Sequence, residues 1–250
     1  MRLPWPPDFP DVVIHTTVTE RDGHPGYAAA KSGDPDAAFE LAFDLLNEAA
    51  IDVLRQSVGQ TKPVLLPVVA EETLGFNAIP DAMAQILARE LGLPAIAGEV
   101  VQTNKVGHTR AKAFQRLVTP ALFEGDVAAG TKYLLIDDHV GLGGTLASLR
   151  GLVEMRGGHV IGMTALTESR DGRKISVRPA TLNMLRDKHG EPLDQFWQSQ
   201  FGYGIDCLTD VEGQVLCRQP SVDAIQAFLA KAAVEARGRG IEPAAGSEGA

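Results

Sequence analysis

The segment that most constrains the fold is a short apolar run, residues 133–136, that leads into two adjacent acids, Asp137 and Asp138, and then into a glycine-rich turn at 141–145. A continuous apolar run of this length is typical of a strand buried in a parallel sheet. After the turn, apolar residues follow helical spacing until Gly157. The segment therefore predicts a strand, a tight turn and a helix that packs on the sheet.

Strands and helices alternate on both sides of this segment. Residues 64–70 form another apolar run, a helical pattern covers 80–91, and further strands are expected at about 95–101 and 160–166. Such alternation predicts βαβ units, a parallel sheet and right-handed crossovers. We therefore expect an α/β fold with a central parallel sheet and flanking helices.

The chain divides into four segments by pattern. Residues 1–62 begin with a proline-rich stretch and continue into a helix, and 63–167 form the α/β core. Residues 168–236 are expected to be helical and irregular. Residues 237–250 are small, polar and rich in glycine, so we expect a disordered tail.

Two helix starts stand out in the outer segments. Asp34, followed by a proline, is placed as the N-cap of a helix of about twenty residues that ends near Gly59. Thr209 and Glu212 have the spacing of a capping box, in which each residue binds the backbone N–H of the other.

Composition excludes several functional classes. The chain has 250 residues, 44% of them hydrophobic, and a net charge of −9, which argues against a general nucleic-acid or anionic-membrane partner. Cys207 and Cys217 have no second pair and no histidine cluster, so neither a zinc site nor a disulfide framework is expected. No signal-peptide pattern or membrane-length apolar run occurs, so we expect a cytoplasmic protein.

The acids and the turn together predict a site for a sugar phosphate. Ligands of open parallel sheets bind beyond the carboxyl ends of the strands. Two adjacent carboxylates there suit a sugar diol with Mg²⁺, so Asp137 and Asp138 are candidate catalytic and metal-binding residues. The backbone N–H groups of a glycine turn at a helix N-terminus suit a phosphate. The candidate phosphate-binding residues are Gly141, Leu142, Gly143, Gly144 and Thr145.

Three other interpretations of this segment were weighed. A dinucleotide-binding loop would follow its strand directly, but here two acids intervene and Leu146 occupies the last glycine position. A P-loop would need a lysine in the turn, which contains none. The third interpretation is an ordinary strand-to-helix turn with solvated acids.

The segment resembles the phosphoribosyl-diphosphate (PRPP) signature of the type I phosphoribosyltransferases, in which a hydrophobic strand runs into two acids, an apolar pair and a hydroxyl-rich turn. The residues Gly75, Phe76 and Asn77 resemble the ComF-like branch of the same superfamily. The resemblance implies a hood built from residues 1–62 and 168–236 that recognises the acceptor. A homodimer is compatible with this resemblance.

The resemblance also implies a pyrophosphate site with Mg²⁺. In the family, the loop after the first strand of the core contacts pyrophosphate, and a mobile loop between later strands closes over it. The stretch 101–118 has several basic residues, Arg116 among them, and no acid, as a lid over a diphosphate would need. A solvated or nucleic-acid-facing surface is the alternative. The candidate pyrophosphate-binding residues are Ala70, Glu71, Glu72, Lys105, His108, Arg110 and Lys112.

The sequence departs from the family pattern in the turn. Gly141 and Leu142 replace the usual hydroxyl residues, His139 replaces an aliphatic one, and no general base is found at Gly141. We expect an enzyme of nucleotide metabolism that transfers a 5-phosphoribosyl group between PRPP and a nitrogen acceptor, with PRPP or a nucleoside monophosphate as ligand. The alternatives are a non-catalytic PRPP or nucleotide sensor and a ComF-like accessory protein of DNA uptake or processing.

Overall fold

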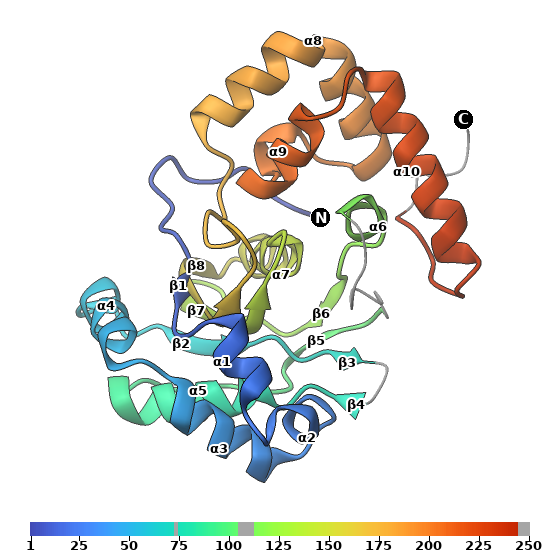
Figure 1. Cartoon of the computed structure of the whole chain (residues 1–250). Helices are drawn as coiled ribbons and strands as arrows, with labels where there is room; N and C mark the ends of the chain where they lie inside the picture. Colours follow the sequence, from blue (N-terminus) through green and yellow to red (C-terminus); the bar gives the residue numbers. More distant parts are fainter. Residues whose placement is uncertain (73–74, 105–112, 245–250) are drawn as a thin grey trace.

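The computed structural model describes residues 1–72, 75–104 and 113–244. Its centre is a sheet with the strand order β1-β8-β7-β2, in which each neighbouring pair is parallel. The strands are β1 (Val13–Ile14), β2 (Val64–Pro67), β7 (Lys132–Val140) and β8 (His159–Glu168). The expected α/β fold with a central parallel sheet and flanking helices is confirmed (Figure 1).

Helices cover both faces of the sheet. On one face lie α3 (Pro35–Leu45), α4 (Glu48–Val58) and α5 (Ile79–Leu91), and on the other lies α7 (Gly144–Met155). Leu134 of β7 packs in a cluster with residues of α3, α4 and α5, and Leu135 packs in a cluster with residues of α7. Because successive residues of a strand point to opposite faces, a run that is apolar at every position is what two covered faces require.

The N-terminal segment supplies one edge strand of the sheet, β1, and two short helices. Val13 and Ile14 of β1 pair with Thr164 and Ala165 of β8. Two residues are too few to show an alternating pattern, so no sequence signal predicted this strand. Two short helices follow, α1 (Val18–Gly23) and α2 (Tyr27–Lys31).

The C-terminal helices form a separate cluster with its own core. The fully buried Trp197 lies in it, together with apolar residues of α6. The predicted capping box at Thr209 and Glu212 is confirmed at the start of α9. The elements of this region, upper part of Figure 1, are α6 (Ala113–Val118), α8 (Pro179–Phe201), η1 (Ile205–Cys207), α9 (Asp210–Cys217) and α10 (Val222–Arg237).

Two expected elements differ in the structure. The single helix expected from Asp34 to about Gly59 is two helices, because Asn47 caps a new one through a bond from Ala50 N–H. The strand expected at 95–101 joins the central sheet only at its first residue, where Ala95 forms a single parallel bridge with Leu65 of β2. Instead β5 (Val100–Gln102) pairs antiparallel with β6 (Phe123–Gly125), while β3 (Glu71–Glu72) pairs with β4 (Gly75–Phe76).

Beyond α10 the chain runs on to a contact with α6. Residue 237 closes α10, and Ala244 N–H donates to the carbonyl of Val118 at 2.7 Å. Residues 245–250, the rest of the expected tail, lie outside the described residues.

Within the described ranges, no helix has the length and apolar character needed to span a membrane.

Candidate functional site

The two acids lie inside β7 rather than after it. The strand continues to Val140 because His139 and Val140 pair with β8. On the other side β2 ends at Pro67, opposite Ile136, so the acids lie just beyond the carboxyl end of that neighbour. Asp137 and Asp138 are only 6% and 5% exposed. They are therefore held by the sheet at the edge where ligands of parallel sheets bind.

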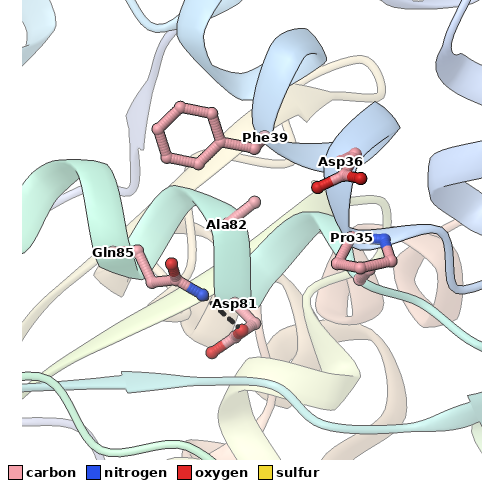
Figure 2. A pocket seen from close by; sticks show the side chains of 7 residues that line it. Pro35, Asp36, Phe39, Asp81, Ala82 and Gln85 are labelled. Atoms are coloured by element: carbon pink, nitrogen blue, oxygen red, sulfur yellow. Dashed lines mark hydrogen bonds between the residues drawn. The ribbon is translucent and has the colours of Figure 1, made fainter.

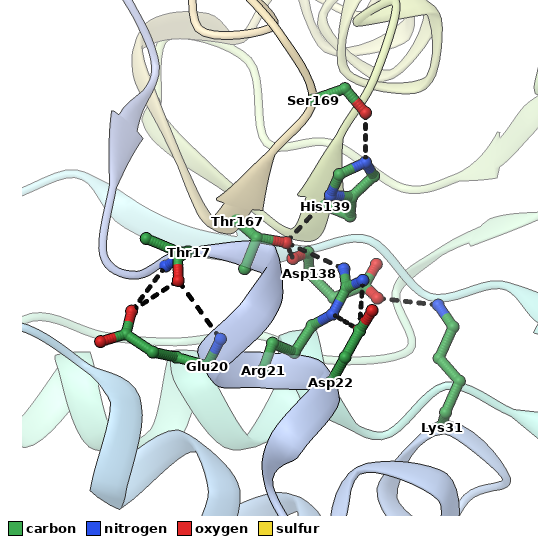
Figure 3. A network of polar contacts seen from close by, with 9 residues as sticks. All are labelled: Thr17, Glu20, Arg21, Asp22, Lys31, Asp138, His139, Thr167 and Ser169. Carbon is green, nitrogen blue, oxygen red and sulfur yellow. Dashed lines mark hydrogen bonds and ion pairs between the residues drawn. The ribbon is translucent and has the colours of Figure 1, made fainter.

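Each acid already has a hydrogen-bond partner. The backbone N–H of Asp138 donates to Oδ1 of Asp137 at 2.8 Å. The ammonium of Lys31, from the last residue of α2, lies 2.7 Å from Oδ2 of Asp138 (Figure 3). Nothing in the sequence marked Lys31 as a site residue, since it lies more than a hundred positions away at the end of a short helix. Only the packing of α2 against the core brings it to the acids.

A polar network surrounds the acid pair, the name used below for Asp137 and Asp138. Arg21 of α1 donates from Nη1 to Oγ1 of Thr167 at 2.9 Å, and that hydroxyl donates to the carbonyl of Asp138. His139 contacts the same hydroxyl through Nδ1 and Ser169 through Nε2, each at 2.9 Å. A contact between His139 and a ligand remains a prediction.

Burial and neighbouring charge separate the two carboxyl groups. Burial, and then the charge of Asp138, raise the pKa of Asp137 well above its ordinary value. Burial also pushes the pKa of Asp138 upward, but the Lys31 ammonium outweighs it and leaves that pKa below its ordinary value. Asp137 therefore keeps its proton to a higher pH than Asp138 does. A protonated carboxyl can both donate and accept hydrogen bonds, as a sugar hydroxyl requires.

The acid pair does not fit a directly bound Mg²⁺. An ion on Oδ2 of Asp138, at the usual 2.0–2.1 Å, would lie within about 5 Å of the Lys31 ammonium. At that distance and an effective dielectric of 20, two unit positive charges repel by about 3 kcal/mol, and a doubly charged ion repels the ammonium by about twice as much. Among the described residues, no group of three or more His, Cys, Asp or Glu side chains is placed to hold a metal ion.

The turn at 141–145, called the glycine turn below, offers unpartnered donors. Gly143 has φ of +83° and caps α7, a conformation that disfavours a side chain. In the described part of the chain, no acceptor binds the backbone N–H groups of these five residues. Successive N–H groups at a helix N-terminus form a cavity suited to a small anion. The candidate phosphate-binding residues are therefore brought together as a set of donors.

A guanidinium lies against this turn. A Cβ placed on Gly141 would be 2.3 Å from Nη1 of Arg116, which belongs to α6. Burial lowers the pKa of Arg116 from its ordinary value, but a guanidinium stays charged at neutral pH. Arg116 was part of the basic stretch seen in the sequence, and the absence of a side chain at Gly141 makes room for it. The pair was not predictable, because the two residues lie 25 positions apart on unrelated elements.

The far side of the turn is held by a buried ion pair. Nη1 of Arg2 lies 2.6 Å from Oε2 of Glu212, and Nη2 of Arg2 donates to the carbonyl of Gly144 at 3.3 Å. Burial opposes the charge of Arg2, but Glu212 holds its pKa above the ordinary value. Thr209, the capping residue of α9, donates to the carbonyl of Leu142. Arg2 and the start of α9 thus hold two carbonyls of the turn, at Leu142 and Gly144, while no described residue accepts from its N–H groups.

The predicted pyrophosphate residues are only partly described. Ala70 is partly buried, and its carbonyl accepts from Asn77 N–H at 3.4 Å. Glu71 and Glu72 form β3 of a small hairpin in place of the expected loop, and their side chains are not described. Lys105, His108, Arg110 and Lys112 lie outside the described residues. A pyrophosphate role for all of these stays a prediction.

Two cavities of the described residues contain no predicted site residue. One, of about 170 Å³, lies between α3 and α5 and is lined by Phe39, Ala82 and Gln85, whose amide donates to Asp81 (Figure 2). The other, of about 590 Å³, lies between the proline-rich N-terminal stretch and the start of α8. Neither cavity is lined by the acid pair or by the glycine turn, so neither changes which residues form the candidate site.

Comparison with known proteins gives similarities of limited extent. No family model matches the chain. It is 41% identical over 238 residues to Protein TraN of Escherichia coli, covering 95% of this chain and 53% of that protein. It is 28% identical over 124 residues to HGPRTase-like protein 2 of Haloquadratum walsbyi, covering 47% of this chain and 60% of that protein. The chain thus spans little more than half of the length of these curated relatives.

Solved structures similar to the chain include an adenine phosphoribosyltransferase. That structure shares 18% sequence identity and has a TM-score of 0.34, covering 55% of this chain and 71% of the other. A superposition of this quality does not establish a common fold.

Proposed function

We propose that the chain binds a pentose 5-phosphate at the glycine turn and the acid pair, and that it transfers a 5-phosphoribosyl group between PRPP and a nitrogen acceptor. The observation that carries the proposal is the set of N–H groups at 141–145 without an acceptor, directly beyond two buried carboxyl groups. A phosphate on the turn places the sugar hydroxyls of the same molecule near the acids.

Each half of the site has one task in this reaction. The glycine turn and Arg116 hold the 5-phosphate, and Asp137 and Asp138 hold the ribose hydroxyls. The bond from the anomeric carbon to the diphosphate breaks, a bond from that carbon to the acceptor nitrogen forms, and the nitrogen loses a proton. The sugar carries positive charge in the transition state, so a fixed sugar beside an ionised Asp138 lowers the barrier.

The rest of the proposal concerns the diphosphate, the acceptor and the assembly. Diphosphate would be bound by Ala70, by β3 (Glu71–Glu72) and by the basic residues Lys105, His108, Arg110 and Lys112, with any Mg²⁺ at this end of the site and not on the acid pair. Residues 1–62 and 168–236 would contact the acceptor. A cytoplasmic location, and a homodimer as the assembly, belong to the same proposal.

The similarity to HGPRTase-like protein 2 supports this choice of chemistry. It extends over 124 residues, close to half of this chain. It supports the class of reaction and not the acceptor, because this chain covers only 60% of that protein.

A second candidate is a nucleotide-binding regulator without transferase activity. In some phosphoribosyltransferases an acid in the turn assists proton transfer at the base. Here that position is Gly141, and the side chain beside it is the guanidinium of Arg116, which cannot accept a proton. This replacement favours binding over catalysis.

Calorimetric titration of the full chain with PRPP and with ribose 5-phosphate tests both candidates. We expect binding that the double variant D137N/D138N weakens at least tenfold, because hydrogen bonds to charged groups contribute about 1.5–3 kcal/mol. The matched control D187N/D194N removes two acids of α8 and should bind as the wild type does. Pyrophosphate release with a panel of bases identifies the enzyme, and binding without release identifies the regulator. No binding of either ligand contradicts both.

A further inference from the structure

The acid pair already has a cation beside it. Nζ of Lys31 lies 2.7 Å from Oδ2 of Asp138, and the lysine side chain is only 24% exposed. We propose that Lys31 is the resident cation of the acid pair, so that a pentose 5-phosphate binds here with no divalent ion on Asp137 or Asp138. The inference rests on the proposed function, since it concerns the same ligand, but it makes a separate claim about the metal.

Lys31 is held in place by the packing of α2. Ala30 is fully buried, and its carbonyl accepts from Ala78 N–H at 3.2 Å. Just after Lys31 the backbone passes so close to β4 that a Cβ on Gly33 would lie 2.9 Å from the carbonyl oxygen of Phe76. A lysine on an anchored backbone loses less conformational freedom on pairing than one on an exposed helix, so this ion pair is stronger than a typical surface pair.

A second cation lies on the same side of the acids. The guanidinium of Arg21 binds the hydroxyl of Thr167, which itself donates to the carbonyl of Asp138. Arg21 is itself paired with Asp22, whose Oδ1 lies 2.8 Å from its Nη2. The positive charge that a divalent ion on Asp138 would meet directly is therefore the ammonium of Lys31.

The positive charges near the acid pair come from one segment of the chain. Lys31 and Arg21 both come from the N-terminal residues 1–62, whose strand β1 joins the central sheet next to β8. The N-terminal segment then has a task at the sugar end of the site, in addition to any contact with the acceptor.

Titration of the full chain with ribose 5-phosphate in EDTA and in millimolar Mg²⁺ tests the inference. Ribose 5-phosphate has no diphosphate, so an effect of Mg²⁺ on its binding reports on the acids. We expect the wild type to bind equally in both buffers. The variant K31M should bind at least tenfold more weakly in EDTA, because it leaves Asp138 without its ammonium, and Mg²⁺ should restore part of the loss. K132M, which removes an exposed lysine from the opposite end of β7, is the matched control and should bind as the wild type does.

The outcomes separate the two claims. Wild-type binding that requires Mg²⁺ overturns the inference and leaves the proposed function standing, whereas no binding in either buffer contradicts the proposed function itself. Equal binding by K31M and the wild type in EDTA also overturns the inference. If circular dichroism shows that K31M does not fold, K31R decides: retention of EDTA-insensitive binding supports a resident cation, and a new need for Mg²⁺ speaks against it.

Discussion

In the acid pair the charges are already matched, whereas in the glycine turn the donors still lack acceptors. Asp138 has Lys31 at 2.7 Å and Asp137 accepts a backbone N–H. The N–H groups of 141–145 bind no acceptor among the described residues, and Arg116 adds a positive charge beside them. If the proposed function holds, we expect the turn to provide most of the affinity for an anionic ligand. The acid pair, whose charge is balanced, is better suited to select a sugar by its hydroxyls.

The two halves also depend on different parts of the chain. The acid pair is completed by the N-terminal helices α1 and α2, and the glycine turn by Arg2, α6 and α9. The following substitutions should therefore affect one half while leaving the other intact.

The largest effect is expected from E212Q, which leaves the buried guanidinium of Arg2 without a negative partner. Removing one member of a buried ion pair costs about 3–5 kcal/mol of unfolding free energy, measured by urea denaturation. The glycine turn should lose its anchor at Gly144, so phosphate binding weakens as well. D52N breaks the exposed pair with Arg55 and should cost less than about 1 kcal/mol. Similar losses in the two variants would contradict a structural role for the buried pair.

Acid should weaken the attachment of the N-terminal segment to the sheet. His15, just after β1, contacts the hydroxyl of Thr164 and accepts the N–H of Asn47. Burial lowers its pKa from 6.5 to about 4, so the unfolded chain takes up a proton at a higher pH than the folded chain. Stability from this group is complete above pH 6.5 and is lost as the pH falls toward 4, by up to about 3 kcal/mol.

Thermal unfolding at a series of pH values measures this loss. H15Q removes the titrating group, so its stability should depend less on pH over the same interval. An unchanged pH dependence in H15Q would show that another group is responsible.

G143A should disturb the glycine turn more than a comparable change elsewhere. A Cβ at this position would lie 2.6 Å from Ile175 and 3.0 Å from Thr209, in addition to the strain of a positive φ. G130A shares the positive φ but would meet no atom within 4 Å, so it isolates the backbone cost of about 1–2 kcal/mol. G143A should lose about 1–3 kcal/mol more than G130A and bind phosphate less well. Equal losses would mean that the turn tolerates a side chain.

The smallest effect is expected from R116M, which should leave stability nearly unchanged. Loss of a charged donor beside Gly141 should weaken ribose 5-phosphate binding about tenfold, as judged by titration. R218M, an exposed arginine at the end of α9, serves as the control. Unchanged affinity in R116M would indicate that the backbone of the turn holds the phosphate by itself.

Much of the core followed from local sequence. The apolar run before Asp137 and the helix after the glycine turn were predicted because a buried strand and an amphipathic helix have periodicities that a short window displays. The capping box at Thr209 was recognised for the same reason. The break at Asn47 was missed, because the apolar spacing of α3 runs on into α4 and hides a cap inside the pattern.

The partners of the site were beyond the reach of sequence patterns. The order Asp137, Asp138 and glycine turn is fixed by the chain itself, because adjacent residues stay adjacent however the protein folds. Lys31 and Arg116 reach the same place from helices far apart in sequence, and their positions depend on how those helices pack. The sequence by itself determined which groups could bind a sugar phosphate. Only the tertiary structure decided which of them are already neutralised and which still lack a partner, because charge pairing and burial depend on distances that no local pattern contains.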